Sequence, residues 1–127
     1  MIKTVYTIVS NEKIADGTYR MRLSGDTGAI TAPGQFIDIS VPELFLRRPI
    51  SVCDWDGSGL TVIYKTVGRG TDAMSKMRPG DVLEALSGLG NGFDMSRCAR
   101  RTAVIGGGVG TPPLLGLAKR LAAAGHE

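Results

Sequence analysis

The segment Arg47-Arg48-Pro49-Ile50-Ser51 begins a strand and, at the same place, carries groups that suit one kind of ligand. Proline fixes φ and has no N–H to donate, so Pro49 fits the first residue of an edge strand. The arginine before it offers a bidentate fork for phosphate or a flat face for a ring. The Ser51 hydroxyl can hydrogen-bond a polar ring edge. The segment indicates a strand that lines a binding site or, alternatively, a solvated arginine pair before an ordinary strand.

Short strands and turns surround this segment over the first hundred residues. Tyr19, Met21 and Leu23 alternate with arginines, which predicts a strand with one buried and one solvent-exposed face. Six strands at this spacing predict a mainly β, small antiparallel barrel. The predicted strands cover residues 4–14, 19–23, 37–41, 49–55, 60–67 and 82–86.

A second segment, running from Ile63 to Thr71, joins a strand to a short helix through two glycines. Thr71 is expected to cap a helix over residues 72–77. Gly68 and Gly70 would let a phosphate approach the positive end of that helix. The two segments together suit a flavin dinucleotide, which has a diphosphate and a heteroaromatic ring. An ordinary turn and cap, with Tyr64 in the core, fits the second segment equally well.

The pattern changes after residue 101. Residues 102–105 form a short apolar run that predicts a strand, followed by a glycine turn over 106–110 and a helix that ends near Gly125. Thr111 is expected to cap this helix, with Pro112 in its first turn. A glycine turn between strand and helix suits a nucleotide pyrophosphate. A single βα unit cannot bury its own apolar faces, so the chain is expected to stop just inside a second domain. The expected domains are 1–97 and 98–127.

The overall composition excludes several classes of protein. With 43% hydrophobic and 21% charged residues, the chain is typical of a soluble globular protein. It has no apolar run long enough for a membrane helix and no signal peptide. The net charge of +3 comes from short basic groups, which suit local phosphate contacts better than a duplex-binding stripe. Two cysteines are too few for a four-thiolate metal site, and no catalytic triad can be built around His126.

These segments, in this order, resemble the ferredoxin reductase superfamily, in particular the electron-transfer subunit of B-type, NAD-dependent dihydroorotate dehydrogenase. The resemblance covers nearly the whole chain. It is carried by residues 33–36, 46–51, 68–71, 78–81, 89–93 and 106–113. One departure is Ser87-Gly88, where the family has Gly-Pro, and this change is expected to loosen the turn before Leu89.

The resemblance implies a six-stranded antiparallel Greek-key barrel that binds flavin, followed by the first βα unit of an α/β nucleotide-binding domain. Arg48 would contact the FAD phosphate and Ser51 the edge of its ring. The other implied FAD-binding residues are Pro49, Ile50, Ile63, Tyr64, Lys65, Gly70 and Thr71. The implied residues facing the NAD dinucleotide are Gly107, Gly108, Gly110, Thr111 and Pro112.

The resemblance also implies an oxidoreductase subunit in pyrimidine biosynthesis. FAD would accept hydride from NADH and pass single electrons to an FMN-containing dihydroorotate dehydrogenase catalytic subunit, in a cytoplasmic heterotetramer that binds no nucleic acid and no membrane. The cysteines that hold a 2Fe–2S cluster in the family are absent here, and the NAD site is incomplete. This chain alone is therefore not expected to be catalytically competent.

Two other functions fit parts of the pattern. A ferredoxin:NADP or sulfide-linked reductase subunit would keep the fold and change the electron partner. A non-enzymatic barrel that binds single-stranded nucleic acid would need several exposed aromatic side chains on one sheet face. No such cluster is evident from the sequence.

Overall fold

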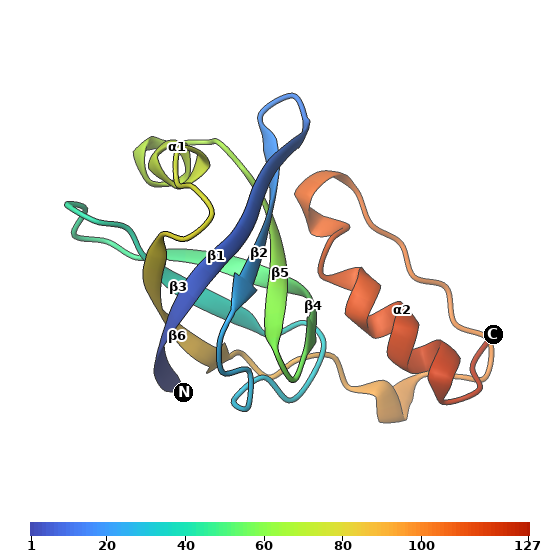
Figure 1. The fold of residues 1–127 in the computed structure, drawn as a ribbon. Coiled ribbons are helices and arrows are strands. Elements are labelled where there is room, and N and C mark those ends of the chain that lie inside the picture. Colours follow the sequence, from blue (N-terminus) through green and yellow to red (C-terminus); the bar gives the residue numbers. More distant parts are fainter.

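The computed structural model describes all residues 1–127 and folds most of them into a closed barrel (Figure 1). Neighbouring strands follow the order β1-β2-β5-β4-β3-β6, and every pair is antiparallel. The predicted six-stranded Greek-key barrel is therefore confirmed. The strands are β1 (Ile2–Ala15), β2 (Thr18–Ser24), β3 (Phe36–Ser40), β4 (Arg48–Asp56), β5 (Gly59–Lys65) and β6 (Val82–Leu89).

Strand β1 closes the ring by pairing with a different neighbour at each end. Its first half, from Ile2 to Thr7, pairs with β6, and the part from Thr7 to Ala15 pairs with β2. The strand is long because it pairs with β6 along its first half and with β2 along its second, and only Tyr6 and Ile8 of its residues are buried. No strand edge of the barrel is left open along this seam.

The core follows the alternation that the sequence predicted. Alternate residues of every strand point inward, and Met74 from the short helix between β5 and β6 joins them. The buried cluster contains Tyr6, Ile8, Met21, Leu23, Ile30, Ile37, Ile39, Val41, Val52, Leu60, Val62, Tyr64, Met74, Leu83 and Ala85. Burial of this continuous apolar interior is the main stabilising contribution to the fold.

Helix α1 (Arg69–Ser75) differs from the prediction at both ends. Its N-cap is Gly68, not Thr71, and it ends two residues earlier than expected. Thr71 occupies the third helical position, where its Oγ1 accepts hydrogen bonds from the N–H groups of Val67 at 2.9 Å and Gly68 at 3.2 Å. The hydroxyl therefore satisfies donors before the helix, and an extended glycine takes the cap position.

The strand predicted at residues 102–105 does not form. This segment has no strand partner, and Ile105 is 89% exposed. The physical reason is that an isolated parallel strand has no ladder to join, because all six barrel strands already pair with one another. The apolar run alone was not sufficient evidence for a strand.

The predicted second helix does form, but it begins later than expected. A 3₁₀ turn, η2 (Gly108–Gly110), precedes α2 (Leu114–Ala123), whose N-cap is Pro113. Thr111 is therefore not its cap. Prolines 112 and 113 donate no N–H, and the first bonds, from Leu114 N to the Thr111 carbonyl and Leu115 N to the Pro112 carbonyl, span only three residues. Gly125, with φ of 87°, follows the helix end as predicted.

A 3₁₀ turn, η1 (Met95–Arg97), links the barrel to the C-terminal segment. Ser87 and Gly88, which stand where the family has Gly-Pro, lie within β6. Gly88 has φ of 72°, and the strand continues through it to Leu89. No helix in the structure combines the length and apolar character needed to cross a membrane.

Candidate functional site

A groove of about 350 Å³ opens where β4, β5 and the start of α1 meet. It brings together most of the residues that the two sequence segments singled out. Seven of the FAD-binding candidates line it directly, and an eighth, Thr71, lines its helix side. The complete lining is Arg48, Pro49, Ile50, Ser51, Ile63, Tyr64, Lys65, Val67, Thr71 and Val109.

Antiparallel pairing explains why these segments meet. Strands β4 and β5 are joined by a tight hairpin at Gly57-Ser58, and Val52 pairs with Val62 near the middle. The start of β4 therefore lies beside the end of β5, from which the chain passes directly into α1. Residues 48–51, 63–65 and 71 are far apart in sequence but share one wall of the molecule.

Arg48 supplies the positive charge at the helix side of the groove. Its Nη1 donates to the carbonyls of Leu46 and Arg47, and no carboxylate pairs with it. The side chain lies against Gly70: a β-carbon on Gly70 would come within 2.0 Å of Nε of Arg48. Gly70 therefore does not itself line the groove, but its bare backbone makes room for the guanidinium.

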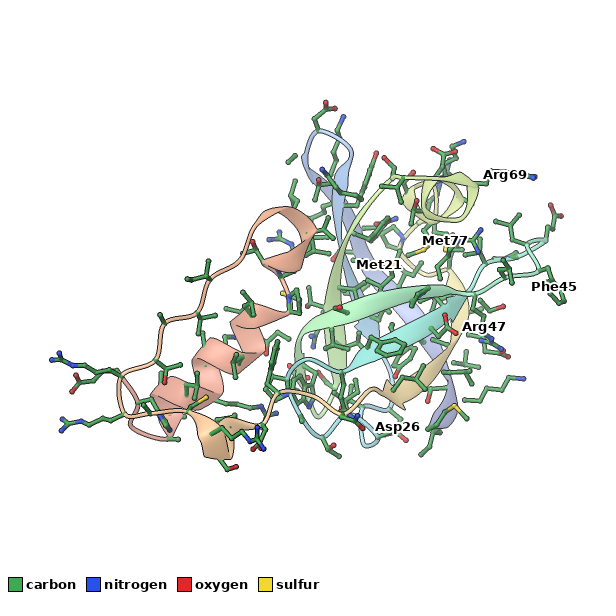
Figure 2. The ribbon with its side chains drawn as sticks, turned by 180° about the vertical axis from the view of Figure 1, so that it is seen from behind. Met21, Asp26, Phe45, Arg47, Arg69 and Met77 are labelled. Carbon is green, nitrogen blue, oxygen red and sulfur yellow. The ribbon has the colours of Figure 1, made fainter.

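Arg47 has a different environment, although it neighbours Arg48 in sequence. Its Nη2 lies 3.0 Å from Oε1 of Glu84 on β6. Hydrogen bonds from Arg47 and then from Lys3 lower the pKa of the Glu84 carboxyl. Figure 2 shows Arg47 at the base of the β3–β4 loop, whose tip carries Phe45. Only the second arginine of the pair faces the groove.

Backbone donors are free beside the Arg48 guanidinium. The N–H groups of Arg69, Gly70 and Thr71 meet no acceptor within the protein, as is usual in a first helical turn. The Arg69 side chain projects from α1 into solvent and forms no ion pair (Figure 2). The groove lining thus offers unpaired donors and positive charge and contains no acidic side chain, while Asp72 in the first turn of α1 pairs with Lys76, an arrangement that suits an anion.

Tyr64 forms part of the groove floor and belongs to the core. It is 1% exposed, and its hydroxyl donates to Oδ1 of Asn11 at 2.8 Å. Asn11 in turn donates to the carbonyls of Met74 and Met77, which ties α1 to β1. Burial raises the pKa of Tyr64 to about 12. Its ring stacks on Tyr19, with centroids 5.8 Å apart. The residue supports the groove and fixes the helix beside it.

The glycine turn contributes a second cavity of about 410 Å³ next to the groove. Of the five predicted NAD-facing residues, Gly108 and Pro112 line this cavity, whereas Gly107, Gly110 and Thr111 line neither cavity. The two cavities share Ile63, Lys65 and Val109. The remaining residues that line the second cavity are Ala15, Asp16 and Thr18.

Sequence reasoning missed five lining residues: Val67, Val109, Ala15, Asp16 and Thr18. Val67 and Val109 sit next to glycines in segments already singled out, so their position was a usable signal. Asp16 and Thr18 lie at the β1–β2 hairpin, and nothing in their local sequence relates them to residues near position 108.

Several curated proteins are similar in sequence to the chain. No family model matches the chain. The chain is 42% identical, over its whole length, to the dihydroorotate dehydrogenase B (NAD(+)) electron transfer subunit of Streptococcus mutans. It is also 42% identical, over 90% of its length, to the subunit of that name from Clostridium perfringens. It covers 52% and 46% of these proteins, so it spans about half the length of the curated relatives it matches.

Solved structures share the fold over nearly the whole chain. An NADH-dependent reduced ferredoxin–NADP oxidoreductase matches 94% of the chain with a TM-score of 0.83 and 28% identity, over 45% of its own length. Phthalate dioxygenase reductase, a modular structure for electron transfer from pyridine nucleotides to [2Fe-2S], matches 97% of the chain with a TM-score of 0.78 and 28% identity, over 40% of its own length. The chain has a ferredoxin reductase-like fold. This ferredoxin reductase-like chain therefore has the barrel that its sequence resemblance implied.

Proposed function

We propose that the chain binds FAD in the groove between β4, β5 and α1, as part of an electron transfer subunit of NAD-dependent dihydroorotate dehydrogenase. The observation that carries this proposal is that Arg48, Ser51 and Thr71 line one groove. Had Ser51 and Thr71 lain on opposite sides of the molecule, one dinucleotide could not span them. The names of relatives that are 42% identical support the assignment of the subunit.

The groove's two ends suit the two chemical parts of a flavin dinucleotide. At the helix end, the Arg48 guanidinium and the free N–H groups of the first turn of α1 would hold the diphosphate. Gly70 keeps a bare backbone there, and a β-carbon would strike Arg48. At the other end, the exposed Ser51 hydroxyl would bond the polar edge of the ring. Pro49, Ile50, Ile63, Tyr64 and Lys65 complete this wall.

Bound FAD would accept a hydride from a nicotinamide cofactor and release electrons one at a time. The residues of this chain would bind and orient the cofactor, and none of them is assigned a proton-transfer role. The Tyr64 hydroxyl is occupied by Asn11 and stays protonated because burial raises its pKa to about 12. It therefore serves as a fixed wall of the groove.

The second cavity supports the proposed position of the nicotinamide dinucleotide. Gly107, Gly108, Gly110, Thr111 and Pro112 would face it, and two of them line the cavity beside the groove. The proposed division into an FAD-binding unit, 1–97, and the opening of an NAD-binding unit, 98–127, is consistent with this arrangement. A 2Fe–2S cluster does not fit the residues present, since Cys53 and Cys98 are the only thiols and such a cluster takes four.

The proposed partner is an FMN-containing dihydroorotate dehydrogenase catalytic subunit, in a cytoplasmic heterotetramer. The relatives are named as electron transfer subunits, and electrons collected by such a subunit must leave to another protein. The nucleic-acid alternative has no comparable support. Phe45 and Phe93 are the exposed large aromatic side chains, and Phe93 packs against Gly34.

Titration with FAD tests the proposal directly. The purified chain is mixed with FAD, freed of unbound cofactor and examined for the two visible absorption bands of oxidised flavin. We expect retention by the wild type and clear loss in Arg48→Ala. Arg47→Ala is the matched control, because Arg47 binds Glu84 outside the groove. A folded wild type that retains no flavin, or equal retention by Arg48→Ala and wild type, contradicts the proposed site.

A second function keeps the flavin site and changes the acceptor. The similarity to an NADH-dependent reduced ferredoxin–NADP oxidoreductase, at 28% identity, favours ferredoxin as that acceptor. The two candidate functions are distinguished by adding NADH, together with either ferredoxin or the dihydroorotate dehydrogenase catalytic subunit, to the flavin-loaded protein. Faster reduction of the catalytic subunit supports the proposal, whereas faster reduction of ferredoxin supports the alternative.

A further inference from the structure

Helix α2 packs against the outer side of β4 through one close apolar contact. Leu117 and Leu121 are buried beneath the helix. At Gly116, a β-carbon would lie 3.4 Å from the Cys53 carbonyl oxygen and 3.4 Å from the Trp55 ring. The helix thus approaches the strand closely, and Figure 1 shows it running alongside β4. None of these α2 residues belongs to the barrel core.

Two polar pairs flank this contact. Nζ of Lys119 donates to Oδ2 of Asp54, and this hydrogen bond to the Asp54 carboxylate raises the pKa of Lys119. The guanidinium carbon of Arg120 lies 4.2 Å from the centroid of the Trp55 ring, within range of a cation–π interaction. Asp54 and Trp55 follow the groove residue Ser51 by three and four positions on the same strand.

The position of α2 determines where the glycine turn lies. The turn is joined to the helix by only three residues, 111–113, two of which are prolines. At its other end, η2 contacts β5, and Val109 within it lines both the groove and the second cavity. A displacement of α2 from β4 would therefore carry Val109 away from both.

We propose that the contact between α2 and β4, made by Asp54, Trp55, Lys119 and Arg120 around Gly116, positions the glycine turn so that Val109 lines the flavin groove. This inference rests on the proposed function of the groove. The four side chains are positioning residues, because none of them lines either cavity. The contact therefore determines how easily solvent or an electron donor can reach the bound flavin.

Trp55 makes the contact measurable without flavin, because it is the only tryptophan in the chain. Asp54→Lys and Lys119→Asp each place like charges together, whereas the double reversal restores an ion pair. Because exposed pairs contribute modestly, each single change is expected to raise the undocked fraction about fivefold. Trp55 emission should shift to the red in the single variants and return in the double variant. Lys3→Met, which breaks the exposed Lys3–Glu84 pair on another wall, is the matched control.

Flavin accessibility completes the test. Quenching of bound flavin fluorescence by acrylamide, an uncharged quencher, should rise in both single variants and return toward the wild-type value in the double variant. Unchanged Trp55 emission in both single variants overturns the proposed contact. A shift in Trp55 emission without a change in flavin quenching overturns its positioning role. If the chain binds no flavin, the proposed function fails, whereas the Trp55 measurement still decides whether the contact exists.

Discussion

The Arg48 side chain crosses the first turn of α1 at Gly70, where a β-carbon would come within 2.0 Å of Nε and 2.6 Å of the guanidinium carbon. A strand residue and a helix residue thus form one surface only because one of them lacks a side chain. Gly70 is buried, and its φ needs no glycine, so steric contact with Arg48 is the reason that a glycine is required there.

Gly70→Ala tests this relationship. Alanine favours helices over glycine by about 1 kcal/mol, so helix propensity alone predicts a more stable chain. The collision with Arg48 predicts the opposite for the groove: Arg48 must move, and FAD affinity should fall about tenfold or more. The measurement is a flavin titration. Gly68→Ala is the control, since no atom lies within 4 Å of its added β-carbon. Equal affinity in both variants contradicts the steric explanation.

Thr71→Val tests the hydrogen bonds that organise the start of α1. Valine keeps the shape and removes the oxygen that accepts the N–H groups of Val67 and Gly68. The free energy of unfolding should fall by about 1–2 kcal/mol, as for the loss of a helix cap. Urea denaturation measures it. Ser75→Ala removes an exposed hydroxyl that donates to the Asp72 carbonyl and should have little effect. A similar loss in both variants would mean that the Thr71 oxygen has no special role.

Ionisation of Tyr64 is expected to lower the free energy of unfolding at high pH. Its pKa is raised from 10.0 to about 12, mainly by burial, so the folded state holds the proton more tightly than the unfolded chain. The contribution is fully present below pH 10 and is lost as pH rises from 10 toward 12. Absorbance of tyrosinate should show one residue titrating near pH 12, and Tyr64→Phe should remove that step. A step that persists in the variant belongs to another tyrosine.

Ser87→Ala should stabilise the barrel. Ser87 is completely buried in β6, and its Oγ has no hydrogen-bond partner. Removing an unsatisfied buried hydroxyl is expected to raise the free energy of unfolding by about 1 kcal/mol. Urea denaturation again provides the measurement, with the exposed Ser24→Ala as control. A less stable Ser87→Ala variant would show that the hydroxyl has a partner, such as a buried water.

The barrel could be predicted from sequence because each strand carries its own evidence. The alternation at Tyr19, Met21 and Leu23 and the turn residues between strands are local signals, and local signals suffice for a fold of short antiparallel neighbours. The prediction of a strand at residues 102–105 was wrong for the same reason, because an apolar run gives no information about which strand it would pair with. Strand formation depends on neighbours that periodicity does not reveal.

The candidate site was predictable in part for a related reason. Residues 48–51 and 63–65 were identified because charged, rigid and glycine-rich segments have distinctive local sequences. The N-cap of α1 was misplaced because Gly68 and Thr71 both suit helix starts, and only the three-dimensional path decides between them. The Lys119–Asp54 pair joins residues 65 positions apart, and no local pattern relates them.

Closure of the barrel depends on a single strand shared by two neighbours. The pairing of Ile2–Thr7 with β6 keeps the backbone of that strand from offering an open template to another molecule. Fraying of these first residues would leave β6 able to recruit a foreign strand, so resistance to aggregation resides in the N-terminal few residues. Fusion of a bulky tag directly to Met1 would strain that same segment, whereas a flexible spacer would leave it paired.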